Sequence, residues 1–176
     1  MDAVEQYVDE IKRLIDAVMK TQRNSIEQAA ELSAAALCGE GFLFTFGTGH
    51  SHILAEEIFY RAGGLARVCP ILEDSLMLHR GAAASSMYER TPGLAKLLLD
   101  NVDTLKYGGV LFLFSNSGCN TVAVEMAEYA KQRGLKTVCI TNITHSTRMS
   151  SRHPLGLKLK DVCDVVIDNC GCYGDA

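Results

Sequence analysis

Val110-Leu-Phe-Leu-Phe-Ser-Asn-Ser-Gly-Cys-Asn-Thr121 decides the fold, because it leads the strongest strand signal of the chain directly into a polar turn. The apolar run Val110–Phe114 is unbroken, which is typical of a strand buried on both faces of a sheet. The segment Thr121–Arg133 is expected to be a helix that ends at Gly134. A buried strand followed at once by a helix is the repeating unit of α/β proteins.

The same unit occurs earlier in the chain. Phe42–Phe46 is a short apolar run that indicates a buried strand, and Gly47-Thr-Gly-His-Ser51 follows it directly. We expect a helix over His52–Ala62, stopped by Gly63-Gly64. The sequence therefore contains two strand–loop–helix units with similar loops.

Other segments complete an alternation of strands and helices. Glu73–Arg90 is interpreted as a loop with short helices, and a helix is expected to start at Thr91-Pro92. Further strands are expected at Ala66–Leu72, Lys136–Thr141 and Val162–Asp168. Such alternation indicates a parallel sheet covered on both faces. We predict an α/β three-layer sandwich with a five-stranded parallel sheet in the flavodoxin-like order 2-1-3-4-5.

The first 38 residues are predicted to be a long helical segment. A break is expected near Thr21–Asn24, where Asn24 would cap a second helix with Glu27 as its capping-box partner. Apolar residues recur at helical spacing at Val4, Val8, Ile11, Leu14, Ile15 and Val18. This stripe is expected either to cover the sheet or to pair with a second subunit. We interpret residues 1–176 as one domain, with a core over residues 41–168.

Composition excludes several classes of partner. The 176 residues carry a formal net charge of −4 and no basic block, so we expect neither nucleic acid nor a membrane surface as partner. No apolar stretch is long enough to span a bilayer, and the seven cysteines are typical of a reducing compartment. We predict a cytoplasmic protein. A closing helix is expected after the last strand, so a fragment of a longer chain stays one of two open interpretations beside a complete chain.

The two loops have the features of an anion site. A helix N-terminus offers backbone N–H groups, glycine allows close approach, and hydroxyls donate to phosphate or sugar oxygens. Neither loop has the P-loop lysine, and His52 occupies the third glycine position of the dinucleotide fingerprint, so no cofactor is expected. The alternative is an ordinary tight turn. The predicted substrate-binding residues are Gly47, Thr48, Gly49, His50, Ser51, Ser115, Asn116, Ser117, Gly118, Asn120 and Thr121.

The order of these segments resembles the SIS (sugar isomerase) domain family from about Gly41 to Asp168. Ser115–Thr121 looks like the second phosphate loop of that family, and Gly47–Ser51 looks like the first. The segment Ser151-Arg-His-Pro resembles a group of bacterial SIS proteins related to phosphoheptose isomerase. The resemblance implies that a phosphorylated sugar is the ligand and that the protein is a homodimer or homotetramer.

Glu57 and His79 are the predicted catalytic residues. Aldose–ketose isomerisation needs a base beside a carbonyl and an acid that moves protons between oxygens. The His and Glu that phosphoheptose isomerases carry four residues apart fall here on Glu57 and Arg61, so that pair is not reproduced and no metal is expected. The alternatives are a solvated helix face for Glu57 and a surface histidine for His79.

Arg152 and His153, which precede the last strand, are weaker candidates that could close over a ligand, and the alternative is a polar surface loop. Glu89 and Arg90 are weaker candidates still. Three functions remain open: a sugar-phosphate isomerase, a phosphosugar etherase or lyase, and a sugar-phosphate sensor without catalysis.

Overall fold

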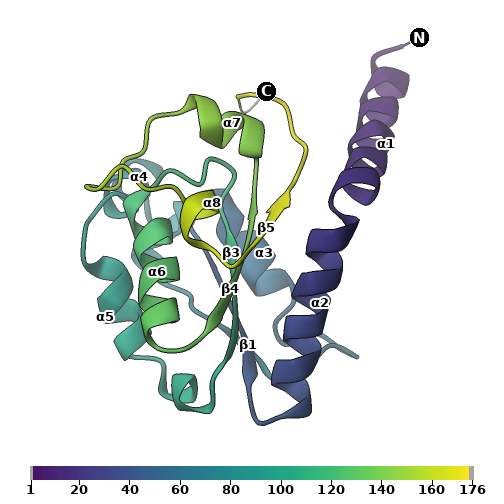
Figure 1. The fold of residues 1–176 in the computed structure, drawn as a ribbon. Coiled ribbons are helices and arrows are strands. Elements are labelled where there is room, and N and C mark those ends of the chain that lie inside the picture. The colour runs from purple at the N-terminus through teal and green to yellow at the C-terminus, as the bar shows by residue number, and fades with distance from the viewer. Residues whose placement is uncertain (1, 175–176) are drawn as a thin grey trace.

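Five parallel strands form the centre of the structure, in the spatial order β2-β1-β3-β4-β5 (Figure 1). The computed structural model describes residues 2–174 of the chain. The strands are β1 (Phe42–Gly47), β2 (Val68–Pro70), β3 (Gly109–Phe114), β4 (Lys136–Thr141) and β5 (Val165–Asp168). The predicted fold class and strand order are therefore confirmed.

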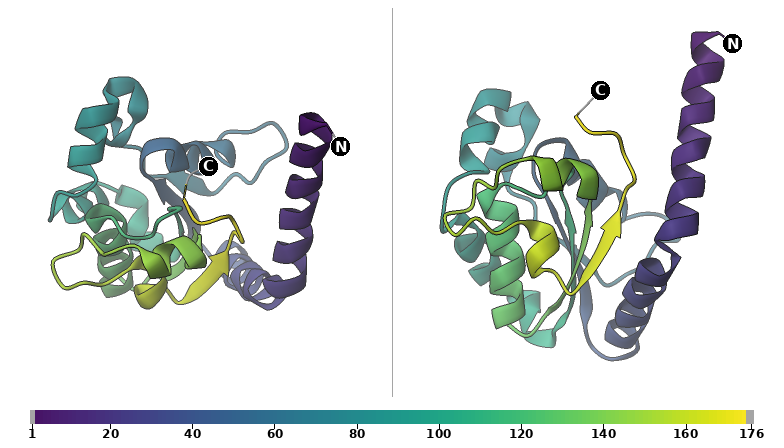
Figure 2. Two further views of the ribbon diagram at one scale, coloured as in Figure 1. Left: turned by 90° about the horizontal axis from the view of Figure 1, so that it is seen from above. Right: turned by 45° about the horizontal axis from the view of Figure 1, so that its top comes forward.

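Helices cover both faces of this sheet, as Figures 1 and 2 show. On β1, Leu43 packs on the face of α2 (Arg23–Cys38), and Thr45 donates to a carbonyl of α3 (His52–Glu57) on the same face. Phe44 and Phe46 point to the opposite face, where α5 (Leu94–Asp100) and α6 (Thr121–Gln132) bury them. Successive side chains of the strand point to opposite faces of the sheet, and helices bury both faces. The structure therefore has three layers, helix, sheet and helix.

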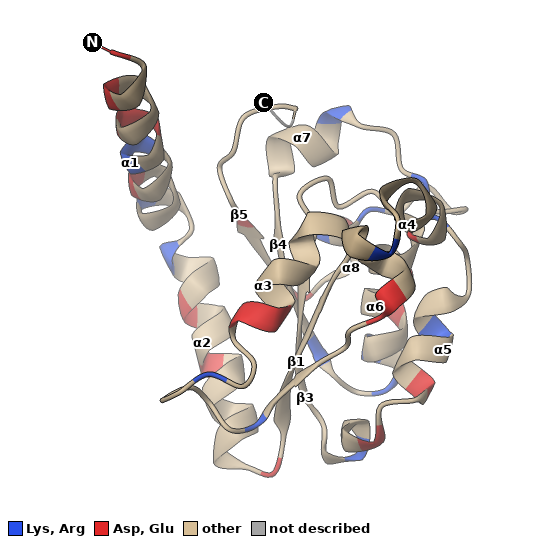
Figure 3. Ribbon diagram, turned by 180° about the vertical axis from the view of Figure 1, so that it is seen from behind, with Lys and Arg blue, Asp and Glu red and all other residues tan. Residues whose placement is uncertain are grey.

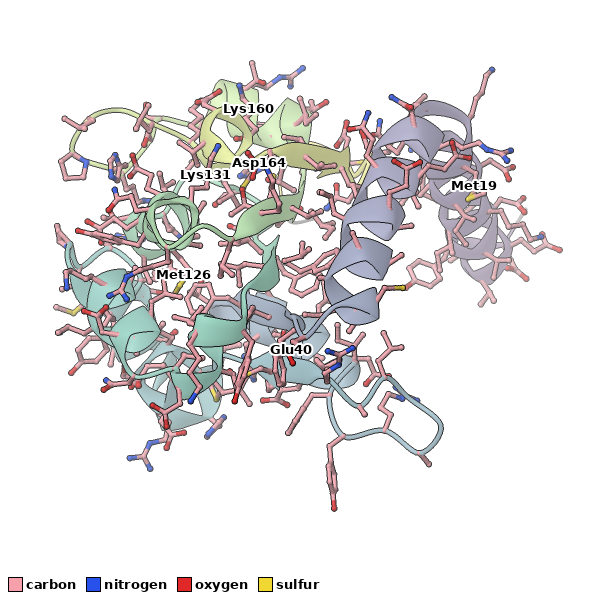
Figure 4. The ribbon with its side chains drawn as sticks, turned by 60° about the horizontal axis from the view of Figure 1, so that its bottom comes forward. Met19, Glu40, Met126, Lys131, Lys160 and Asp164 are labelled. Atoms are coloured by element: carbon pink, nitrogen blue, oxygen red, sulfur yellow. The ribbon has the colours of Figure 1, made fainter. Side chains whose placement is uncertain are left out.

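The outer edge of the sheet is fastened to α6. Figure 4 shows Met126 of α6 in the interior, and Lys131 and Asp164 close together at the surface. The Lys131 ammonium lies 3.0 Å from the Asp164 carboxylate, which also accepts the Thr137 amide at 2.9 Å. Burial raises the pKa of Asp164, but hydrogen bonds from Thr137 and the ion pair with Lys131 outweigh it, so the pKa lies below its usual value.

Several predicted boundaries were wrong. Helix α3 ends at Glu57, not at Ala62, because Tyr60 takes a left-handed backbone with φ of 53°. The last strand begins three residues late, because α8 (Leu159–Val162) occupies the start of the predicted segment. Asn24 lies inside α2, which begins at Arg23. Helix α5 begins at Leu94, after a left-handed Gly93.

The remaining segments are short helices that connect the layers. The Glu73–Arg90 region forms two 3₁₀ turns and a short helix, as expected. A third 3₁₀ turn opens α3, and a fourth precedes β3. These elements are η1 (Gly49–Ser51), η2 (Asp74–Leu76), η3 (Leu78–Arg80), α4 (Ala82–Tyr88), η4 (Asp103–Tyr107) and α7 (Ile143–Arg148).

Helix α1 (Ala3–Thr21) projects beyond the sheet (Figures 1 and 2). A capping box between Asp2 and Glu5 starts it, and none of its residues is buried. Much of its apolar stripe is solvent-exposed in the single chain, and Figure 3 shows that the helix also carries both acidic and basic residues. The stripe therefore does not cover the sheet, which α2 covers instead. Among the described residues, no helix is both long and apolar enough to cross a bilayer.

Candidate functional site

The two loops begin at the same edge of the sheet. Strands β1 and β3 are neighbours in register, with Gly47 level with Phe114. Parallel strands place their carboxyl ends together, and ligands of open α/β sheets bind in the crevice beyond those ends. A cleft of about 670 Å³ lies there, and residues of both loops line it: Thr48, Gly49, His50, Ser51, Ser115, Asn116, Ser117 and Asn120.

Other connections supply the remaining walls of the cleft. Part of the wall comes from η3, α4 and the turn after it, and another part comes from α7 and the loop that follows. The residues are Leu78, Ser85, Ser86, Glu89 and Arg90 on the first part, and His145, Met149 and Arg152 on the second. The cleft is therefore polar and carries two arginines and one carboxylate among the described residues.

The first loop is shaped by a close turn of its own backbone. A side chain at Gly47 would place its Cβ 2.5 Å from the Ser51 carbonyl oxygen, so only glycine fits there. The Thr48 hydroxyl donates to the Glu89 carboxylate at 3.0 Å. This bond brings Glu89, from the end of α4, against the first loop.

The second loop is tied to the elements around it. Gly118 has φ of 59°, and its amide donates to the Ser115 hydroxyl at 3.1 Å. The Asn116 carbonyl accepts the Asn142 amide at 3.0 Å, and the Gly118 carbonyl accepts the Leu159 amide at 2.8 Å. The loop is thus held against β4, α7 and α8 before any ligand arrives.

Three of the predicted substrate-binding residues do not line the cleft. Gly47 and Gly118 shape the two turns, as described above. Thr121 is fully buried, and its hydroxyl donates to the Arg152 carbonyl at 2.8 Å. In the single chain, Thr121 therefore supports the loop and does not face the cleft.

Neither of the predicted catalytic residues lines the cleft. Glu57 lies at the end of α3, with its side chain 60% exposed and ion-paired with Arg61. His79 is exposed, and its ring centroid lies 6.4 Å from that of His52. Leu78 lines the cleft in place of its neighbour. The catalytic roles of Glu57 and His79 stay predictions.

His145 is the titratable residue that sequence reasoning missed among the described residues that line the cleft. It lies on α7, just beyond the carboxyl end of β4, so the position after a third strand was the available signal. It is 8% exposed, and its Nδ1 accepts the Gly174 amide at 3.0 Å while Tyr173 packs against its ring. In the neutral imidazole the proton then resides on Nε2.

No group of three or more His, Cys, Asp or Glu side chains within residues 2–174 is placed to hold a metal ion. The described residues that line the cleft bring hydroxyls, amides, two imidazoles, one carboxylate and two guanidinium groups.

Comparison with known proteins identifies the family. Residues 6–142 match the SIS domain family. The chain is 47% identical over 173 residues to a UPF0309 protein of Thermoanaerobacter pseudethanolicus, covering 97% of this chain and 70% of that protein. The chain belongs to the SIS domain family. A UPF0309 protein of Caldanaerobacter subterraneus is 48% identical over 171 residues, which cover 97% of this chain and 69% of that protein. This SIS-domain chain is thus also a member of the UPF0309 group.

Solved structures share the fold of this SIS domain at low identity. Phosphoheptose isomerase from Neisseria gonorrhoeae aligns with a TM-score of 0.70 and 20% identity, covering 97% of this chain and 86% of that one. Phosphoheptose isomerase from Francisella tularensis aligns with a TM-score of 0.65 and 16% identity, covering 97% of this chain and 87% of that one. The sugar isomerase domain of an RpiR transcription factor from Sphaerobacter thermophilus aligns with a TM-score of 0.55 and 17% identity. That alignment covers 94% of this chain and 73% of the other.

Proposed function

We propose that the cleft binds a phosphorylated sugar and catalyses aldose–ketose isomerisation. One observation carries the proposal: two Ser/Thr/Gly-rich loops from neighbouring strands line a single cleft of about 670 Å³. A sugar phosphate fits such a site because hydroxyls and amides bind its oxygens and the strand ends converge on it. The solved phosphoheptose isomerases with this fold support the substrate class.

The phosphate is assigned to the second loop. Ser115, Ser117 and Asn120 line the cleft at the start of α6, a twelve-residue helix with the positive end of its dipole at that point. Because this loop is pre-formed, little conformational entropy is lost when an anion binds there.

The sugar then extends toward the first loop, where Glu89 lies. In the proposed reaction, the Glu89 carboxylate takes the proton from C2 of an aldose and returns it to C1 of the enediol. The hydroxyl at C2 becomes the carbonyl of the ketose as the proton on its oxygen moves to the oxygen at C1. His145, with its proton on Nε2, is the proposed donor and acceptor for the oxygens.

A sensor without catalysis is the second candidate. The shared fold with the sugar isomerase domain of a transcription factor favours it, because that domain accompanies a regulatory function. Both candidates need the same phosphosugar cleft, and they differ only in whether the bound sugar exchanges its C1 or C2 hydrogen with solvent.

Incubation with aldose and ketose phosphates in heavy water separates the candidates. We expect solvent deuterium at C1 or C2 of one sugar, with thermal stabilisation of the protein by the same sugar. Stabilisation without exchange would support the sensor. If no phosphorylated sugar stabilises the protein, the proposed function is wrong.

Two variants locate the binding and the chemistry. Ser117→Ala should weaken binding about tenfold, because it removes one donor to an anionic group. Glu89→Gln should retain binding and lose exchange, because the amide cannot take a proton. Ser150→Ala is the matched control, since Ser150 is exposed and does not line the cleft.

We further propose that α1 pairs with a second copy of the chain in a homodimer or homotetramer. Val4, Ile11 and Ile15 are 71%, 40% and 58% exposed on one face of a nineteen-residue helix, and paired helices bury such a stripe. The stripe also includes Tyr7, Val8 and Met19. Ile15→Asp should lower the mass measured by sedimentation equilibrium. A wild-type mass equal to one chain would overturn the assembly.

A further inference from the structure

Arg152 is locked beside the second loop by three hydrogen bonds. Its amide donates to the Cys119 carbonyl at 2.8 Å, and its carbonyl accepts the Thr121 hydroxyl at 2.8 Å. Its guanidinium donates to the Asn120 side-chain oxygen, also at 2.8 Å. Arg152 and Asn120 both line the cleft, so this bond already orders a long cationic side chain at the α6 N-terminus.

Arg90 reaches the same helix start from another connection. The Glu89 carbonyl accepts the Val122 amide at 3.1 Å, which joins the segment after α4 to the first turn of α6. Arg90 follows directly and lines the cleft. Two arginines from separate parts of the chain therefore flank the N-terminus of α6.

The carboxylate and the arginine side chain of the cleft are hydrogen-bonded to different loops. Glu89, the one carboxylate among the described lining residues, is tied to Thr48 of the first loop. Arg152 is tied to Asn120 of the second loop. Positive charge therefore gathers at the second loop, and the negative group lies toward the first.

We infer that Arg152 and Arg90 form an arginine clamp on the phosphate of the ligand, above the α6 N-terminus. This rests on the proposed function and adds to it the preferred charge state of the ligand. A guanidinium offers several N–H donors in a planar fork that matches phosphate geometry. Two of them neutralise a dianionic phosphoryl group, so the site should prefer the dianion to the monoanion.

The test uses inorganic phosphate as probe, titrated calorimetrically into the full chain at constant ionic strength. Arg152→Met and Arg90→Met should each weaken phosphate binding about tenfold or more, since each removes a charged donor. The matched control is Arg148→Met, because Arg148 packs over Tyr173 and does not line the cleft. The control should bind phosphate as the wild type does.

A pH series separates direct contact from a structural role. Wild-type affinity should rise with pH as the phosphate becomes a dianion, and each arginine variant should show a shallower rise. Arg152→Lys keeps one charge and should recover part of the affinity lost in Arg152→Met. Thermal melting of the free variants checks that each is folded.

The outcomes are separable from those of the proposed function. If the wild type binds phosphate and either Met variant binds it equally well, the clamp is wrong while the phosphosugar cleft stands. A pH dependence unchanged in both variants also overturns the clamp. If the wild type binds neither phosphate nor any sugar phosphate, both proposals fall.

Discussion

The two loops follow neighbouring strands and resemble each other in composition, but they are held in different ways. The second loop receives backbone hydrogen bonds from Asn142, Arg152 and Leu159, which lie in three later segments of the chain. The first loop closes mainly on itself: the Ser51 amide donates to the Thr48 carbonyl, and the His52 ring contacts the Gly49 carbonyl. A side-chain hydrogen bond joins it to one distant segment of the described chain, from Thr48 to Glu89.

This difference assigns the loops to different tasks. A loop that many distant groups hold presents its donors in a fixed geometry, which suits a phosphate that is the same in every sugar phosphate. A loop held by its own turn can adjust to the variable part of the ligand. We therefore place the reacting carbons toward the first loop, beside Glu89.

Replacing one glycine in each loop with alanine should give the largest difference between the two loops in the free energy of unfolding. Gly118 and Gly49 both have left-handed φ, of 59° and 56°. A Cβ at Gly118 would lie 2.8 Å from the Thr141 hydroxyl, whereas a Cβ at Gly49 meets nothing within 4 Å. Gly49→Ala should lower the free energy of unfolding by about 1 kcal/mol for backbone strain alone, and Gly118→Ala by about 2–4 kcal/mol once the steric clash is added.

Urea unfolding followed by circular dichroism measures both values. Gly49→Ala serves as the matched control, since it carries the backbone strain without the clash. Equal losses in the two variants would contradict the view that the second loop is held more tightly by its surroundings.

Replacing one threonine in each loop with valine should give a smaller difference between the loops in the free energy of unfolding. Thr121→Val removes the hydroxyl of a fully buried side chain that donates to the Arg152 carbonyl and should lower the free energy of unfolding by about 1–3 kcal/mol. Thr48→Val frees the Glu89 carboxylate, which is partly solvated, and should change stability by less than about 1 kcal/mol.

The same pair differs in function. Thr48→Val should reduce deuterium exchange into the sugar more than it reduces sugar-phosphate affinity, because Glu89 loses its orienting bond. Thr121→Val should mainly weaken affinity, because Arg152 loses an anchor. Thermal shift and exchange measured on both variants check this, and a reversed order would place the chemistry at the second loop.

Local patterns predicted the parts of the fold that depend on local interactions. The apolar runs at Phe42–Phe46 and Val110–Phe114 are strands because both faces of each are buried, and Lys136–Thr141 was predicted to the residue. Helix α3 was predicted five residues too long, because the left-handed backbone at Tyr60 leaves no mark in composition.

Which residues line the wall of the cleft depends on contacts between segments that are distant in the sequence. Glu57 lies one to two turns beyond the first loop in sequence, yet it pairs with Arg61 and lies outside the cleft lining. Conversely, His145 and Arg152 are far from both loops in sequence and line the cleft, because α7 and the loop after it cross the strand ends.

The sequence alone determined that this chain has an α/β sheet in the order 2-1-3-4-5 with two Ser/Thr/Gly-rich loops at one edge. Strand burial and the glycine turns that follow the strands are encoded by neighbouring residues, so they are readable without coordinates. Only the tertiary structure decided which charged side chains face the cleft, because helix rotation and the path of later loops are set by packing over the whole chain.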